Sequence, residues 1–139
     1  VARDSMQYDL DATVFGFELG EVPYEGLRIV PSAPGLVEKA RTFESPPSET
    51  HLGRILTGDR FLTTAKKRDS AYLVDDLDGW AVDMEGAAAG MAAYIEGIDF
   101  LLARVISDRA DGKAPEDFST FLPKASGLIA DLIEHIINA

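Results

Sequence analysis

Residues 100–106 read Phe-Leu-Leu-Ala-Arg-Val-Ile, a nearly continuous apolar run. A run of this length and composition predicts a β-strand that is covered on both faces. Shorter apolar runs at residues 27–30, 51–57 and 80–84 predict three further strands that precede it in the chain. The stretch near Val1 is too short to predict a strand.

Apolar residues at helical spacing alternate with these strands. They predict helices at residues 35–43, 65–77, 86–96 and 121–137, and Ser119 or Thr120 is expected to cap the last of them. Strands that alternate with helices are typical of an α/β layered fold with a largely parallel sheet. The sequence therefore predicts one α/β domain over residues 1–139.

The charge balance and the absence of cysteine exclude several classes of function. Thirteen Lys and Arg against twenty-four Asp and Glu give a net charge of −11, which disfavours nucleic acid and anionic membranes as partners because phosphate groups require a clustered basic face. With no Cys there is no disulfide framework, thiolate zinc site or Cys nucleophile. We expect a cytoplasmic protein with no metal ion and no cofactor.

Three polar clusters follow predicted strands, and ligands in layered α/β folds bind at the carboxyl ends of strands. The clusters are residues 58–61, 83–86 and 107–108. Each has a simpler explanation on its own. Glu85 would suit a helix N-terminus as a capping carboxylate, Ser107-Asp108 would suit a cap or an Asx turn, and Phe61 and Met84 would suit a core. The convergence of the three clusters nevertheless predicts one ligand site.

Four stretches occur in an order and spacing that resemble the nucleoside phosphorylase and nucleosidase superfamily, most closely the 5′-methylthioadenosine/S-adenosylhomocysteine nucleosidases. They are YDLDATVFGF at 8–17, TGDRF at 57–61, VDMEGAA at 82–88 and RVISDRAD at 104–111. The MEGAA and ISDxAD elements are specific as a pair. The resemblance implies a three-layer α/β/α sandwich around a mixed, mostly parallel sheet. It also implies hydrolysis of the N-glycosidic bond of methylthioadenosine and S-adenosylhomocysteine to adenine and a 5-thioribose product.

Residue roles follow from the same resemblance. Phe61 would stack on adenine, the backbone of Leu62 would read the adenine edge, Met84 would pack under the ribose and Glu85 would hold the ribose hydroxyls. Asp108, positioned with Ser107, would donate a proton to N7 of the leaving purine as the catalytic general acid, a role that requires burial to raise the pKa of Asp108. Asp83 belongs to the same substrate-binding motif, although strand alternation turns it away from Met84.

The resemblance also implies contributions from beyond one polypeptide. Phe15 and Pro23 match positions that reach across a homodimer interface into the partner's 5′-alkylthio pocket, and Phe118 matches a position that closes over that pocket. Family members are longer, and their N-terminal half supplies the Glu that activates water. This chain would therefore be the C-terminal portion of a nucleosidase domain, inactive by itself.

Other functions stay open at this point. A purine nucleoside phosphorylase of the same superfamily, in which phosphate replaces water, shares most of these motifs, as do hydrolases of futalosine or AMP. A nucleoside-binding module without catalysis is the alternative from a different class.

Overall fold

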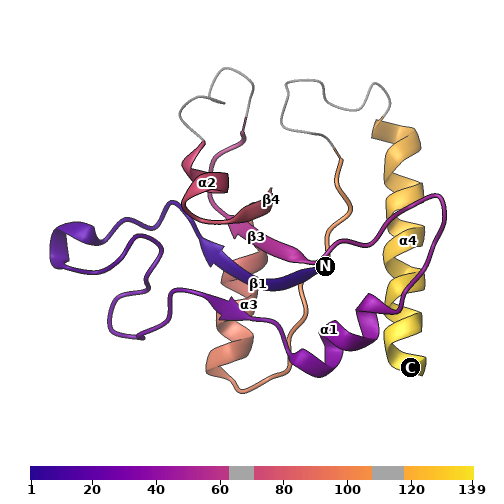
Figure 1. Cartoon of the computed structure of the whole chain (residues 1–139), viewed down its shortest axis with the longest axis horizontal. Coiled ribbons are helices and arrows are strands. Elements are labelled where there is room, and N and C mark those ends of the chain that lie inside the picture. Colours follow the sequence, from indigo (N-terminus) through magenta and orange to yellow (C-terminus); the bar gives the residue numbers. More distant parts are fainter. Residues whose placement is uncertain (63–70, 108–117) are drawn as a thin grey trace.

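The computed structural model describes residues 1–62, 71–107 and 118–139. Its strands are β1 (Ala2–Gln7), β2 (Val30–Pro31), β3 (Gly53–Thr57) and β4 (Gly79–Asp83). The helices are α1 (Pro34–Arg41), α2 (Tyr72–Asp75), α3 (Gly86–Ile95) and α4 (Phe118–Asn138), and a 3₁₀ turn, η1, spans Thr13–Phe15. The strands form one sheet in the order β2-β1-β3-β4, in which only β2 is antiparallel to its neighbour (Figure 1).

Helices cover both faces of this sheet, as the α/β prediction requires. On β3, Leu56 is buried among Met6, Tyr8 and residues of the α2 region, while Ile55 is buried on the opposite face with Ala2 and Leu102. The helix α3 packs across β1 and β3 on the Ile55 face, and α1 and α4 pack against each other at one end of the sheet (Figure 1). The mixed, mostly parallel sheet between helices confirms the predicted fold class.

The prediction of a strand at residues 100–106 is wrong, because the described structure has no strand there. Two single backbone bonds tie this segment to the domain: Ala2 N–H donates to Leu102 O, and Ala33 N–H donates to Phe100 O, both over 2.8 Å. Leu102 is buried, but Ile106 is 59% exposed, so the expected cover on both faces is missing beyond residue 102. A strand is defined by a neighbour to which it bonds repeatedly, and the described residues offer none to residues 103–106.

At the N-terminus a strand was missed: β1 is six residues long and lies inside the sheet between β2 and β3. Its polar residues interrupt the apolar pattern in the sequence. Asp4 forms a largely buried ion pair with Arg54 of β3, with Arg54 Nε 2.5 Å from Asp4 Oδ1, and Ser5 is fully buried. Charges that are paired across the sheet broke the apolar pattern by which a strand is recognised.

Several helix boundaries also differ from the predictions. The helix α4 begins at Phe118, so Ser119 and Thr120 lie inside its first turn and not at the position before it. A helix was predicted at 65–77. Of the described residues in this range, 71–77, only the four of α2 are helical, and residues 63–70 lie outside the described residues. The helix α3 ends at Ile95, and Gly97, which was expected near its C-terminal cap, follows with a φ of +66°, the left-handed conformation that glycine favours. No helix in the described part of the chain is long and apolar enough to cross a membrane.

Tyr8, which follows β1, carries a buried hydroxyl that has no hydrogen-bond partner among the described residues. The ring lies so close to Gly58 that a Cβ there would overlap it. Burial, followed by the nearby Asp9 carboxylate, raises the pKa of Tyr8 above its usual value of 10.0. The folded protein therefore resists ionisation of this side chain.

We expect Tyr8→Phe to be neutral or to stabilise the fold by about 1 kcal/mol, because it removes an unpartnered polar group. Since the pKa is higher in the folded state, wild-type stability is complete below about pH 10 and falls as the pH rises beyond it. Tyr8→Phe should lose less stability over the same range. Urea denaturation on both sides of about pH 10 measures this. Tyr94→Phe, at an exposed position, is the control, and equal alkaline losses in wild type and Tyr8→Phe would contradict the prediction.

Candidate active site

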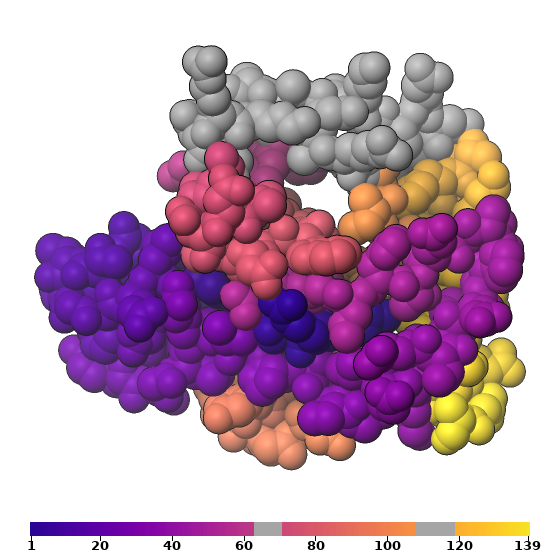
Figure 2. All heavy atoms as spheres, viewed as in Figure 1, coloured from indigo at the N-terminus to yellow at the C-terminus, as the bar shows by residue number. Residues whose placement is uncertain are grey.

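A cleft of about 900 Å³ lies at the carboxyl ends of β3 and β4. Its walls come from the loop after β3, from α2, from the end of β4 and from residues 104–107. In the space-filling view an opening separates the atoms of α2 and β4 from those of the segment before residue 108 (Figure 2). The predicted residues Phe61, Leu62, Asp83, Met84, Glu85 and Ser107 all line this one cleft. The described residues of the three polar clusters therefore meet at one cleft.

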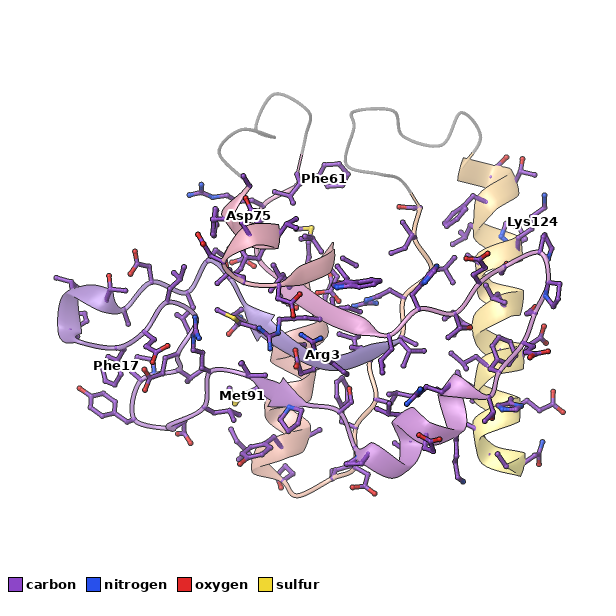
Figure 3. The ribbon with its side chains drawn as sticks, in the orientation of Figure 1. Arg3, Phe17, Phe61, Asp75, Met91 and Lys124 are labelled. Carbon is purple, nitrogen blue, oxygen red and sulfur yellow. The ribbon has the colours of Figure 1, made fainter. Side chains whose placement is uncertain are left out.

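Exposure distinguishes ligand contacts from core packing for two of these side chains. Phe61 is 73% exposed and Met84 is 45% exposed, whereas a core residue would be buried. Phe61 extends from the loop after β3 towards the open side of the cleft (Figure 3). An exposed aromatic ring that borders a cleft presents a flat face to a planar ligand.

Glu85 directly precedes α3, but its side chain makes no capping bond to the helix. The carboxylate is 73% exposed and lies 3.4 Å from Arg104 Nη2. Asp83 performs the capping instead, because both of its carboxylate oxygens accept from Gly86 N–H over 3.1 Å. Glu85 is thus directed to the cleft, where a carboxylate can accept hydrogen bonds from a ligand's hydroxyl groups.

Asp83 is the least exposed of the predicted substrate-binding side chains for which exposure is described, at 7%. Besides Gly86 N–H, its carboxylate accepts from Thr57 Oγ1 over 2.6 Å and from Arg104 Nε over 2.7 Å. The side chain is directed to the start of α3. Sequence reasoning missed Thr57 and Arg104. The signal for Arg104 was its position as the one charged residue in the apolar run at 100–106.

The remaining predicted residues lie outside this described cleft or beyond what the structure describes. Asp108, the predicted general acid, lies outside the described residues. Phe118 is the first residue of α4. Phe15 ends η1 and is 79% exposed, and Pro23 follows in the same β1–β2 connection next to Tyr24, which is 94% exposed. Figure 3 places the neighbouring Phe17 at the left end of the molecule, away from Phe61 at the upper middle.

No group of three or more His, Asp or Glu that could hold a metal ion occurs within residues 1–62, 71–107 and 118–139. The chemistry that this arrangement offers comes from an aromatic face, a thioether, an exposed carboxylate beside an arginine and a buried carboxylate. Together they suit a ligand with a planar ring and hydroxyl groups.

The fold and this cleft belong to a known class of proteins. A family model described as the phosphorylase superfamily matches residues 1–138, and the chain belongs to this superfamily. Among curated proteins, the 5′-methylthioadenosine/S-adenosylhomocysteine nucleosidase of Staphylococcus aureus (strain MRSA252) is 28% identical over 138 residues, which cover 99% of this chain and 60% of the relative. The resemblance inferred from the motifs is confirmed.

Solved structures agree with this assignment. The Neisseria meningitidis 5′-methylthioadenosine/S-adenosylhomocysteine nucleosidase in complex with methylthio-immucillin-A superposes with a TM-score of 0.82 at 30% identity, covering 98% of this chain and 59% of that one. A Helicobacter pylori nucleosidase mutant with 5′-methylthioadenosine in the active site gives a TM-score of 0.83 at 28% identity over 99% and 58% of the two chains. Futalosine hydrolase of the same organism gives 0.83 at 27% identity, with the same coverage. The chain thus spans about three fifths of each relative's length.

Proposed function

We propose that this chain forms the adenine- and ribose-binding part of an enzyme that hydrolyses the N-glycosidic bond of 5′-methylthioadenosine and S-adenosylhomocysteine, releasing adenine and the 5-thioribose product. The observation that carries the proposal is the single cleft that exposes Phe61, Met84 and Glu85 together. The names of the relatives, and the methylthioadenosine present in one related structure, support the same substrate class.

The proposed roles follow the charges that develop during the reaction. Cleavage of the N-glycosidic bond places positive charge on the sugar and negative charge on the departing purine. Glu85 would bind the ribose hydroxyls and stabilise the positive charge. Asp108, held with Ser107, would protonate N7 of the leaving base. Phe61 and the backbone of Leu62 would bind adenine, Met84 would pack under the ribose, and Phe118 would close over the 5′-alkylthio group.

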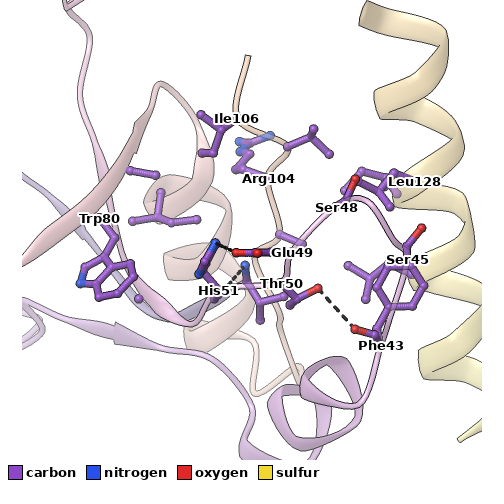
Figure 4. Close-up of a pocket in the computed structure, with 18 residues that line it drawn as sticks. Phe43, Ser45, Ser48, Glu49, Thr50, His51, Trp80, Arg104, Ile106 and Leu128 are labelled. Carbon is purple, nitrogen blue, oxygen red and sulfur yellow. Dashed lines mark hydrogen bonds and ion pairs between the residues drawn. The ribbon is translucent and has the colours of Figure 1, made fainter. Parts of the chain in front are cut away.

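We further propose that an N-terminal segment completes the enzyme and supplies the carboxylate that activates water. The relatives' greater length supports this partner. So does a gap in the structure: β4 pairs only with β3 among the described strands, and residues 103–106 form no backbone bond with another described residue. Both the cleft and a second cavity of about 530 Å³ are lined by Trp80, Ala81 and residues 104–106. Figure 4 shows the second cavity, with Trp80, Arg104 and Ile106 labelled. A strand added here would find unpaired backbone on both sides.

A homodimer formed through the β1–β2 connection is the remaining part of the proposal. The large exposed apolar side chains of Val14, Phe15 and Tyr24 support an interface, because exposed apolar groups that cluster mark contact surfaces. Phe15 and Pro23 would reach the partner's 5′-alkylthio pocket. A chain without cysteine suits the cytoplasm, which we propose as its location.

Binding of methylthio-immucillin-A, the compound in the related Neisseria structure, tests the assignment of the cleft by calorimetry. We expect Phe61→Ala to lose about 1–3 kcal/mol of binding free energy, the usual contribution of a base stacked on an aromatic ring. Glu85→Gln should weaken binding of this nucleoside analogue but leave binding of free adenine nearly unchanged, because only the ribose contacts are altered.

Matched controls come from the other end of α3. Tyr94→Ala removes another exposed aromatic side chain, and Glu96→Gln neutralises another exposed carboxylate. Both should bind as the wild type does. If Phe61→Ala and Glu85→Gln also bound with wild-type affinity, the ligand would not occupy this cleft and the proposed function would lose its support.

The futalosine hydrolase structure matches this chain as well as the nucleosidases do, so futalosine is a second candidate substrate. A phosphorylase of the same superfamily is the other candidate. Parallel assays with methylthioadenosine and with futalosine, each with and without phosphate, separate these activities. Release of adenine from methylthioadenosine without phosphate, with no cleavage of futalosine, favours the proposed nucleosidase.

A further inference from the structure

The interior of the site contains a network that the proposed reaction does not itself use. The Asp83 side chain is 7% exposed and contacts three residues: Thr57 Oγ1 at 2.6 Å, Arg104 Nε and Nη2 at 2.7 Å, and Gly86 N at 3.1 Å from each carboxylate oxygen. A buried carboxylate is stable only when its charge is paired and its lone pairs are filled. These contacts join the ends of β3 and β4, the start of α3 and the segment 100–107.

The directions of the hydrogen bonds in this network are fixed by the groups available. Thr57 is 2% exposed. Its hydroxyl proton is donated to the Asp83 carboxylate, so its oxygen is free to accept, and it accepts from Ala87 N–H over 2.8 Å. Thr57 therefore holds Asp83 and the second residue of α3 at the same time.

Arg104 extends the network from the buried carboxylate to the cleft. Its guanidinium contacts Asp83 Oδ2 at 2.7 Å through Nε and through Nη2, and Nη2 also lies 3.4 Å from Glu85 Oε2. Because the contact with Asp83 is shorter and less exposed, Asp83 sets where Arg104 lies. Arg104 in turn is the cationic partner that faces the exposed carboxylate of Glu85.

We propose that Thr57 and Asp83 are positioning residues that hold Arg104, and through Arg104 hold Glu85 in the orientation that binds the ribose hydroxyls. Asp83 would then not touch the substrate, in contrast to its assignment from the sequence motif. This inference rests on the proposed function, because it takes a ribose as the ligand of Glu85. It predicts that the network controls affinity for the sugar and not for the base.

Asp83→Asn is the sharpest variant. Asparagine keeps the shape and an acceptor for Gly86 N–H and the Thr57 hydroxyl but loses the charge that holds Arg104. We expect affinity for methylthio-immucillin-A to fall about tenfold, within the coupling energies found for side chains in one ion-pair network, while affinity for free adenine changes by less than about twofold. Thr57→Val should show the same loss of affinity for the nucleoside analogue. Thr57→Ser, which retains the hydroxyl, should bind the analogue with wild-type affinity. Asp99→Asn, at an exposed carboxylate, is the control.

A second measurement tests the geometry without any ligand. In ¹H–¹⁵N NMR spectra the Nε–H of Arg104 should give a signal protected from exchange in the wild type and in Thr57→Ser, and Asp83→Asn should abolish it. An unprotected wild-type signal would overturn the network itself.

The binding results separate the remaining outcomes. If Asp83→Asn weakened the nucleoside analogue and adenine equally, Asp83 would be only a helix cap and the positioning role would be wrong. If wild-type protein bound neither compound while the Arg104 signal was protected, the proposed function would fail, and the ribose-directed role of the network would be overturned with it.

Discussion

Asp108→Asn is expected to lower the turnover of methylthioadenosine by about 10²–10⁴-fold, the usual contribution of a general acid. Asparagine retains the shape and hydrogen-bonding capacity of the side chain but cannot deliver a proton to N7 of the leaving purine. Adenine affinity should change much less than turnover, because binding of the base requires a hydrogen bond and not a proton transfer. Steady-state kinetics and adenine binding on the same preparation measure both quantities.

Asp99→Asn provides the matched control, since it makes the same substitution at an exposed carboxylate after α3 and should retain full turnover. Near-normal turnover in Asp108→Asn would reduce Asp108 to the alternative role left open by the sequence, a cap or an Asx turn. A loss of adenine affinity as large as the loss of turnover would instead assign Asp108 to binding alone.

The second large effect concerns the N-terminal segment. Residues 1–139 alone are expected to show no nucleosidase activity, and activity should appear when the N-terminal segment is present, covalently continuous or bound. The described carboxylates of the cleft include Asp83, which is occupied by three partners, and Glu85, which is assigned to the ribose. The water-activating group is expected from the added segment, next to the gap between β4 and residues 103–106.

Activity assays combined with mass spectrometry and light scattering on one preparation test this directly. The account predicts that the active species contains both polypeptide regions and is a dimer. A 15.0 kDa chain that cleaved methylthioadenosine unaided, as a monomer, would contradict both the proposed segment and the proposed dimer.

The arrangement of the site could be predicted from the sequence because it depends on local features. Phe61, Met84 and Glu85 each follow a strand, and parallel strands bring their carboxyl ends to one edge. These inferences need only the order of the elements and the direction of the side chains.

The errors arose where tertiary contacts decide the outcome. The strand β1 was missed because its charges are neutralised by Arg54 and Asp78, which are distant in sequence. The strand at 100–106 was predicted from an apolar run, yet a strand requires a bonded neighbour, and residues 103–106 have none in the described structure. Thr57 was overlooked as a site residue because its role depends on Asp83 and Ala87, contacts that no local pattern specifies.

Product analysis after incubation with methylthioadenosine tests the central claim most directly. The protein carrying its N-terminal segment should release adenine and methylthioribose in phosphate-free buffer, at a rate that added phosphate does not increase. A strict requirement for phosphate, with a ribose-1-phosphate derivative as the sugar product, would contradict the hydrolase and identify a phosphorylase.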